Sequence, residues 1–475
     1  MASYNVSRKN LIAVAIGVVV AIVFALYGVQ NGFSYREVIL GAAATIGLVV
    51  VFGGEFGIVF GFVLWALTLA LGHRTVEITK NLVIHPSEIL LWLLLVCAFA
   101  QRRLLETSRL RVPWWLLLLM PFWALGWWPM IAGGADWDKM LNEFRNFLLL
   151  IPLMIVAAVV LYRQKSWRPL LLAFFLASTW IAFMGVVEYW FPNVATYFPA
   201  FIHAAKPEAT ADGFLRAQFS FYGGAHATFI CVMAVPFCFA ILSWWPQWYA
   251  RAAAVLAAAL QLLAIYIGGY RSLWVVVLLQ VVCACMLRFR KHGVAIAVLS
   301  LIVGVGGYQF IPNTTERAMT TIAALRWQPV DHSAQDRQDR AVGALDEAIS
   351  NPIGQGWASA GWVHSDFLQV AVNLGILPAL IFLAGYLLTL HRLFGKTRIC
   401  LRLGEDADLA LGLLLAFLAA GEHLAVQGVE VLPQLALPVW FVWALVEVWL
   451  RQKSAAPEIA YDYAPANFYP IAGVQ

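Results

Sequence analysis

Long apolar runs separated by short polar segments make up most of the chain. A helix needs about 20 apolar residues to cross a bilayer, and most of the runs approach that length. The candidate spans are centred on residues 11–28, 38–53, 56–72, 88–100, 114–132, 147–162, 169–191, 222–245, 252–270, 272–287, 293–311, 367–390, 408–428 and 433–450. Several are short, and the second and third would also suit one re-entrant hairpin. The pattern therefore predicts an all-α polytopic membrane protein with twelve to fourteen transmembrane helices.

The basic residues predict how these spans are oriented. With a cytoplasmic N-terminus, 19 of the 31 Lys and Arg residues fall in short inside connections, as the positive-inside rule expects. Both termini then lie in the cytoplasm, including the tail 451–475. The first run follows Arg8 and Lys9 and resembles a signal peptide, but further spans follow at once, so we expect a retained helix.

This orientation divides the chain and places its unusual polar segments outside. The parts are spans 1–311 with an external loop at 192–221, a long external loop 312–366, and C-terminal spans 367–450. In the long loop, Val342, Leu345 and Ile349 recur at helical spacing. They predict an amphipathic helix that lies near the membrane surface and covers a cavity.

Composition excludes other broad classes. Hydrophobic residues make up 62% of the chain and charged residues 12%, and the mean hydropathy is +0.78. Soluble domains have about 45–50% apolar and about 25% charged residues, so a soluble enzyme is excluded. The net charge of +5 is dispersed, which argues against nucleic-acid binding. The six cysteines show no pattern of a disulfide framework.

Four arginines are expected on the outer face: Arg216, Arg271, Arg337 and Arg340. Together they could bind a di-anion, because guanidinium groups bind phosphate oxygens in a bidentate manner and keep their charge. Simpler explanations stay open. Arg271 could snorkel from its helix end to the interface, and the pair on the loop helix could be solvated and neutralised by nearby acidic residues.

His364 stands at the mouth of the twelfth predicted span. A histidine titrates near neutral pH and can accept a proton from an attacking hydroxyl, although an interfacial histidine without chemistry is the alternative. Trp327, Trp357 and Trp362 could stack on sugar rings, although an aromatic belt is the commoner explanation for such residues. Gly354-x-Gly356 predicts a turn, because no strand–turn–helix unit surrounds it. The nine histidines show no metal-binding spacing, so we expect no metal site.

These residues form an ordered series of motifs. The series runs Asp339-Arg340, Asn351-Pro352-Ile353-Gly354-Gln355-Gly356, His364-Ser365-Asp366-Phe367-Leu368-Gln369 and Asn373-Leu374-Gly375-Ile376, with Tyr270-Arg271-Ser272 and Leu215-Arg216-Ala217 upstream. It resembles the signature of the O-antigen ligase and polymerase superfamily over residues 210–440. Two departures affect the surroundings of the site: Tyr270 replaces a usual serine, and Gly224-Ala225-His226 replaces a common Pro-Asn.

The resemblance implies an integral membrane glycosyltransferase with a GT-C-like helical fold in the bacterial inner membrane. Such enzymes take a glycan from undecaprenyl diphosphate and pass it to an acceptor hydroxyl at the periplasmic face, by inversion and without a metal or other cofactor. By this likeness His364 would be the general base or would position the acceptor hydroxyl. The donor diphosphate would be held by Arg216, Arg271 and Arg340, with Arg337 beside them. Further candidates for substrate contact or support are His226, Asp366, Trp362 and Tyr270.

The sequence leaves alternatives open for the identity of the acceptor and for the functional class of the protein. The expected partners are the lipid-linked donor, the bilayer, and either lipid A–core or a growing glycan; nucleic acid is not expected. We favour a ligase-like enzyme of lipopolysaccharide biosynthesis, with an O-antigen or exopolysaccharide polymerase as the alternative and ligation to protein as a third possibility. A transporter of lipid-linked glycans is less favoured, because transporters usually have repeated halves and broken helices at the membrane midplane.

Overall fold

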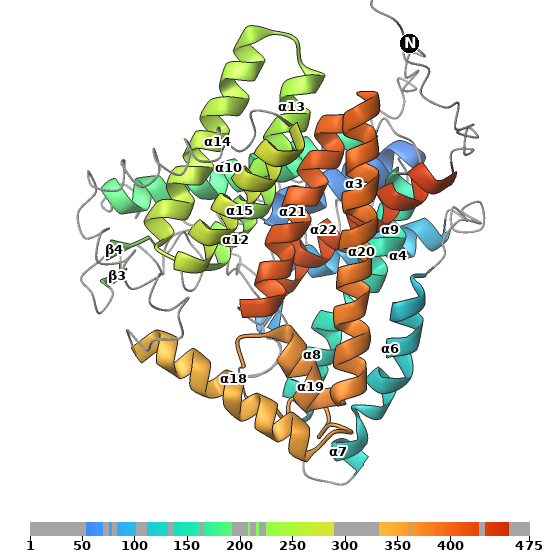
Figure 1. The fold of residues 1–475 in the computed structure, drawn as a ribbon. Helices are drawn as coiled ribbons and strands as arrows, with labels where there is room; N and C mark the ends of the chain where they lie inside the picture. Colours follow the sequence, from blue (N-terminus) through green and yellow to red (C-terminus); the bar gives the residue numbers. More distant parts are fainter. Residues whose placement is uncertain are drawn as a thin grey trace, which may run out of the picture.

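The computed structural model describes residues 54–69, 76–77, 83–100, 112–131, 136–161, 166–191, 208–209, 215–217, 225–288, 332–361, 363–426 and 433–455. These residues are mainly helical (Figure 1). The helices are α3 (Gly54–Thr68), α4 (Pro86–Ala100), α6 (Trp114–Leu125), α7 (Trp128–Ile131), α8 (Trp137–Leu148), α9 (Leu150–Leu161), α10 (Trp167–Trp190), α12 (Ala225–Ala234), η4 (Val235–Phe237), α13 (Cys238–Trp244), α14 (Trp248–Gly268), α15 (Arg271–Arg288), α18 (His332–Ser350), α19 (Asp366–Leu374), α20 (Ile376–Leu403), α21 (Ala407–Val426) and α22 (Pro433–Ala455). Two short antiparallel pairs join β1 (Val76–Glu77) to β2 (Val83–Ile84) and β3 (Glu208–Ala209) to β4 (Leu215–Arg216).

Eight helical stretches among the described residues are long and apolar enough to cross a membrane. They comprise α8 with α9, α10, α12 with η4 and α13, α14, α15, α20, α21 and α22. Shorter apolar helices occupy three further predicted runs, in α3, α4 and α6. The predicted runs 11–28, 38–53 and 293–311 lie outside the described residues. The prediction of a multi-pass helical membrane protein is confirmed.

Helix α22 lies at the centre of the bundle, and α14 and α15 lie at its edge. In the most apolar part of each helix, 89% of the residues are buried in α22 but only 28% in α14 and in α15. Helix α22 packs against α9, α20 and α21, and Trp440 and Trp443 are among its fully buried side chains. On α14, Val255 and Leu256 are exposed. Such apolar outer faces suit contact with lipid.

A proline interrupts the span formed by α12, η4 and α13, and a glutamine from another helix compensates for it. Pro236 has no N–H to donate to the carbonyl of Val232, one turn earlier. The side-chain amide of Gln280 in α15 donates to Val232 O at 3.0 Å and to Leu415 O in α21 at 2.9 Å. A freed backbone group inside a membrane needs such a partner, so Gln280 joins three helices at this break.

The polar helix α18 lies across one end of the bundle, with α19 beside it (Figure 1). The helix predicted around Val342, Leu345 and Ile349 is confirmed, and these three side chains are exposed while Ala344 and Ala348 are buried. The prediction of one continuous span over 367–390 is wrong. The chain breaks at Gly375, whose φ of 107° favours glycine, so α19 is a separate short helix and the span begins at Ile376.

Candidate functional site

A tight loop carries the chain from α18 to His364, and it is fastened to the end of α19. The last carbonyls of a helix have no partner within that helix. Here the loop supplies partners: Gln355 N–H donates to Val372 O at 3.0 Å, and Gly356 N–H donates to Asn373 O at 2.7 Å. In return, Ile376 N–H donates to the carbonyl of Pro352 at 3.0 Å. The turn predicted at residues 354–356 is therefore present.

Close backbone contact explains two glycines of this loop. A Cβ atom on Gly354, whose φ is 87°, would lie 2.5 Å from the backbone nitrogen of Gly375. A Cβ atom on Gly356, whose φ is 98°, would overlap the ring of Pro129 and lie 2.9 Å from the carbonyl of Gly126. Both positions therefore need glycine for space as well as for backbone conformation.

The structure places Trp357 in the core. Its side chain is 2% exposed, and its Nε1–H donates to the carbonyl of Trp123 at 3.0 Å. Its backbone N–H donates to Gly126 O at 2.8 Å, and its ring packs edge-on against Phe144. Neither sugar stacking nor an aromatic belt, the two alternatives considered for Trp357, describes it, because this tryptophan is buried and fixes the loop to α6. Trp327 and Trp362 lie outside the described residues.

His364 stands just before α19 with a half-buried side chain and a φ of 60°. Burial, and then the nearby guanidinium groups of Arg337 and Arg340, lower the pKa of His364 to about 4, while Asp336 opposes this shift. The imidazole is therefore neutral at neutral pH and can accept a hydrogen bond. Asp366, two residues later, is fully buried at the first position of α19, where a helix N-terminus favours a carboxylate.

The two arginines of α18 are not equivalent. Arg340 is exposed and forms an ion pair with Asp336, from Nε to Oδ2 at 2.9 Å. Arg337 is less exposed, and its charge acts on both His364 and Glu422 of α21. The solvated arrangement considered for both arginines therefore describes Arg340, whereas Arg337 faces the interior of the site.

The turn between α14 and α15 meets the end of α21 at the same place. Gly269 ends α14 with a φ of 70°, and the carbonyl of Tyr270 accepts the N–H of Leu273 at 3.2 Å to start α15. Arg271 is the first residue of α15 and is partly exposed. Its neighbour Ser272 lies against the carboxylate of Glu422. Arg271 therefore starts a helix whose first turn adjoins the carboxylate that Arg337 also reaches.

The backbone of two further candidates approaches this turn. Arg216 belongs to β4, and the next N–H, of Ala217, donates to the carbonyl of Ile267 near the end of α14 at 3.2 Å. His226 lies in the first turn of α12, where Thr228 packs against Gly268. The side chains of Arg216 and His226 lie outside the described part of the structure.

Three ionisable residues near the site were missed by the sequence analysis: Glu143, Glu422 and His423. Glu422 and His423 interrupt the apolar run of α21, and His423 is fully buried with its ring stacked on Phe229 at a centroid distance of 3.1 Å. An ionisable residue inside a predicted span is itself a signal of function. Glu143 lies in the polar helix α8 and bonds to the loop before His364.

The chain matches no family model and no curated protein sequence. The chemical possibilities of the site therefore follow from its residues. A neutral imidazole and at least two guanidinium groups, on α15 and α18, lie at one end of the bundle. Such a set can hold a polyanionic group and accept a hydrogen bond from a hydroxyl beside it.

Proposed function

We propose that the protein is a glycosyltransferase that moves a glycan from a polyprenyl diphosphate to an acceptor hydroxyl at the periplasmic face of the bacterial inner membrane. The observation that carries the proposal is the grouping of His364, Arg337 and the first turn of α15 around the end of α21. The motifs that resemble the O-antigen ligase and polymerase superfamily supply His364 and the first turn of α15, from segments that are far apart in the sequence. Arg337 lies two residues before the motif Asp339-Arg340.

The proposed reaction is an inverting displacement. The acceptor oxygen forms a bond to the anomeric carbon, and the bond between that carbon and the diphosphate oxygen breaks with its electron pair on the leaving group. Arg271 and Arg337 would stabilise the charge that develops on the diphosphate. His364 would accept the hydrogen bond, and then the proton, of the attacking hydroxyl. Diphosphate bound beside Arg337 and Arg340 would offset their charge and so raise the pKa of this histidine toward its ordinary value.

Purified protein in lipid nanodiscs, supplied with undecaprenyl-diphosphate glycan, tests the proposal directly. We expect labelled glycan to reach an added acceptor, and we expect His364→Ala and Arg271→Ala to abolish this transfer. Matched controls are His391→Ala, on an exposed position of α20, and Arg251→Ala, at the far end of α14. Both controls should transfer normally. Normal transfer by either site variant would refute the assignment.

The same assay decides between the ligase and its alternative. One reaction receives lipid A–core as acceptor and the other receives additional lipid-linked repeat units. We propose the ligase-like activity, which predicts that lipid A–core becomes labelled. Labelling of the lipid-linked repeats alone would identify a polymerase, and movement of intact donor across the membrane without a new glycosidic bond would identify a transporter.

A further inference from the structure

A buried carboxylate on α8 bonds to the loop that leads to His364. Oε2 of Glu143 accepts the backbone N–H of Ala358 at 2.9 Å and the side-chain N–H of Asn373 at 2.8 Å. The side chain of Glu143 is 9% exposed. One oxygen atom therefore links three segments, namely α8, the loop and α19.

Asn373 extends this link along the loop. Its Oδ1 accepts the backbone N–H of Ala360 and the hydroxyl of Ser359, each at 3.1 Å. Further along, Oε1 of Gln369 accepts the N–H of Val363 at 3.3 Å. Side chains thus hold the backbone of this segment, whose described residues are neither helical nor in a strand.

The loop needs this support because two of its residues have a left-handed backbone. Ala358 and His364 each have a φ of 60°, a conformation that is costly for residues with a side chain and persists only where the surroundings impose it. Glu143 holds the N–H of Ala358 itself, and Asn373 holds the two residues that follow it. The direction of the chain into His364 therefore depends on these bonds.

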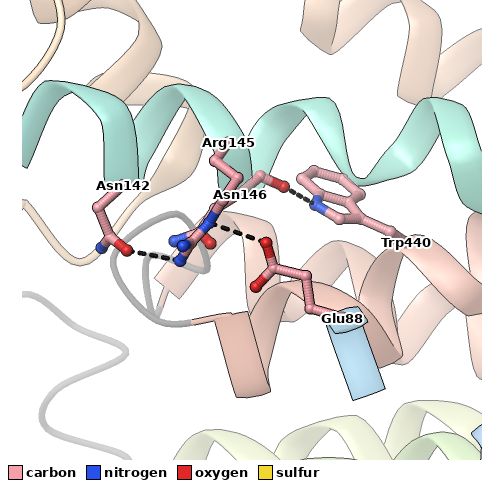
Figure 2. Close-up of polar contacts among 5 residues, drawn as sticks. All are labelled: Glu88, Asn142, Arg145, Asn146 and Trp440. Carbon is pink, nitrogen blue, oxygen red and sulfur yellow. Dashed lines mark hydrogen bonds and ion pairs between the residues drawn. The ribbon is translucent and has the colours of Figure 1, made fainter. Parts of the chain in front are cut away.

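Helix α8 is itself fixed by a second buried polar residue, two positions further along and on the opposite side of the helix. Figure 2 shows Arg145 between two acceptors: Nε lies 3.0 Å from Oε1 of Glu88 in α4, and Nη2 donates to Oδ1 of Asn142 at 2.7 Å. The indole of Trp440 in α22 donates to the backbone carbonyl of Asn146 at 2.8 Å. These contacts tie α8 to α4 and to the central helix, so that Glu143 projects from a rigid element.

We propose that Glu143 is a positioning residue that sets the place of His364 through Ala358 and Asn373. The catalytic part of this inference rests on the proposed function; the structural part does not. Glu143 needs only an acceptor oxygen for this role, because both of its bonds enter the same atom. Its two bonds go to the loop and to α19, and not to the arginines proposed to hold the donor, so its loss should change turnover more than donor binding.

Glu143→Ala and Glu143→Gln separate positioning from general stability. We expect Glu143→Ala to lower kcat at least tenfold with the KM for donor changed less than threefold, and Glu143→Gln to keep kcat within threefold of wild type. Thr389→Val is the stability control, since it removes a buried hydrogen bond of 2.8 Å to Glu447 between α20 and α22. It should leave kcat unchanged. Asn373→Ala removes the hydrogen bonds that hold the loop from the α19 side. It is the replacement test variant if Glu143→Ala does not fold.

Hydrogen–deuterium exchange gives a readout that does not depend on activity. Peptides covering residues 358–361 should exchange faster in Glu143→Ala than in wild type or Thr389→Val. Unchanged exchange, or wild-type kcat in Glu143→Ala and Asn373→Ala, overturns the inference while the proposed function stands. If the wild-type protein transfers no glycan, the proposed function fails, and faster exchange still establishes that Glu143 holds the loop.

Discussion

Replacing Gln280 should destabilise the protein in a way that depends on Pro236. The amide of Gln280 donates to the carbonyls of Val232 and Leu415 at 3.0 and 2.9 Å. Pro236 cannot donate to Val232 O, whereas the carbonyl of Leu415 lies inside the regular helix α21. Gln280→Leu therefore removes from the Val232 carbonyl the donor that replaces the missing N–H of Pro236. From the Leu415 carbonyl it removes only an additional donor.

The size of the expected destabilisation follows from the difference between these two carbonyls. Leaving a buried acceptor without a partner costs about 1–3 kcal/mol, whereas an extra interhelical hydrogen bond in a membrane protein contributes roughly 0.6 kcal/mol. We expect Gln280→Leu to lower the free energy of unfolding by about 2 kcal/mol. Pro236→Ala restores the backbone N–H, so in that background the same change should cost only about 1 kcal/mol.

A double-mutant cycle in mixed micelles, unfolded by sodium dodecyl sulfate, measures this coupling. Gln261→Leu is the matched control. Gln261 is also buried, and it donates to Phe175 O at 3.2 Å and to the hydroxyl of Thr179 at 2.8 Å in the unbroken helix α10. Its loss should add to Pro236→Ala without coupling. An equal cost of Gln280→Leu in both backgrounds would refute the reasoning.

Three further predictions concern the site. Because burial and two arginines lower the pKa of His364 to about 4, the acidic limb of kcat/KM should lie near pH 4 and not near 6.5. The free energy of unfolding should also fall as the pH drops between these values, since the unfolded chain takes up the proton first; a limb near 6.5 would contradict both expectations. Arg337→Ala should lower kcat/KM for donor more than Arg340→Ala, because Arg340 is exposed and already paired; equal losses would argue that both contact the donor. Gly356→Ala should lower the free energy of unfolding by at least about 1 kcal/mol in the same micelle assay. Its control Gly343→Ala, where a Cβ meets no atom within 4 Å, should be neutral or stabilising; equal effects would contradict the steric argument.

Periodicity predicted the helices well, because apolar length is a local property. The runs from 169–191 to 272–287 and from 408–428 to 433–450 match described helices within a few residues. It failed at 367–390, where the apolar character continues through a break in the backbone. At the break Gly375 lies against Gly354, and hydropathy carries no information on such a contact.

The motifs pointed to His364, and the predicted loop helix pointed to Arg337, but neither pointed to the residues around them. Glu143 lies more than 200 residues before its partners, in a helix whose polar side chains are typical of a surface. Only the folded chain shows that this polar face is turned inward. Glu422 was more accessible to prediction, since a charged residue within the run 408–428 is unusual. Its relation to Arg337 and Ser272 still required the packing of α21 against α15.

The charges of the site are arranged in a way that suits a donor that binds and is then released. Arg337 is partly withdrawn from water, and a cation in such a place is costly without an anion. The buried carboxyl group of Glu422 lies within electrostatic range of Arg337. In the proposed reaction the donor diphosphate would supply that anion. The stabilisation of the diphosphate by Arg337 is then greatest when the negative charge on the diphosphate is greatest, as the leaving group departs. Interactions that strengthen toward the transition state, and not in the bound ground state, are those that accelerate a reaction.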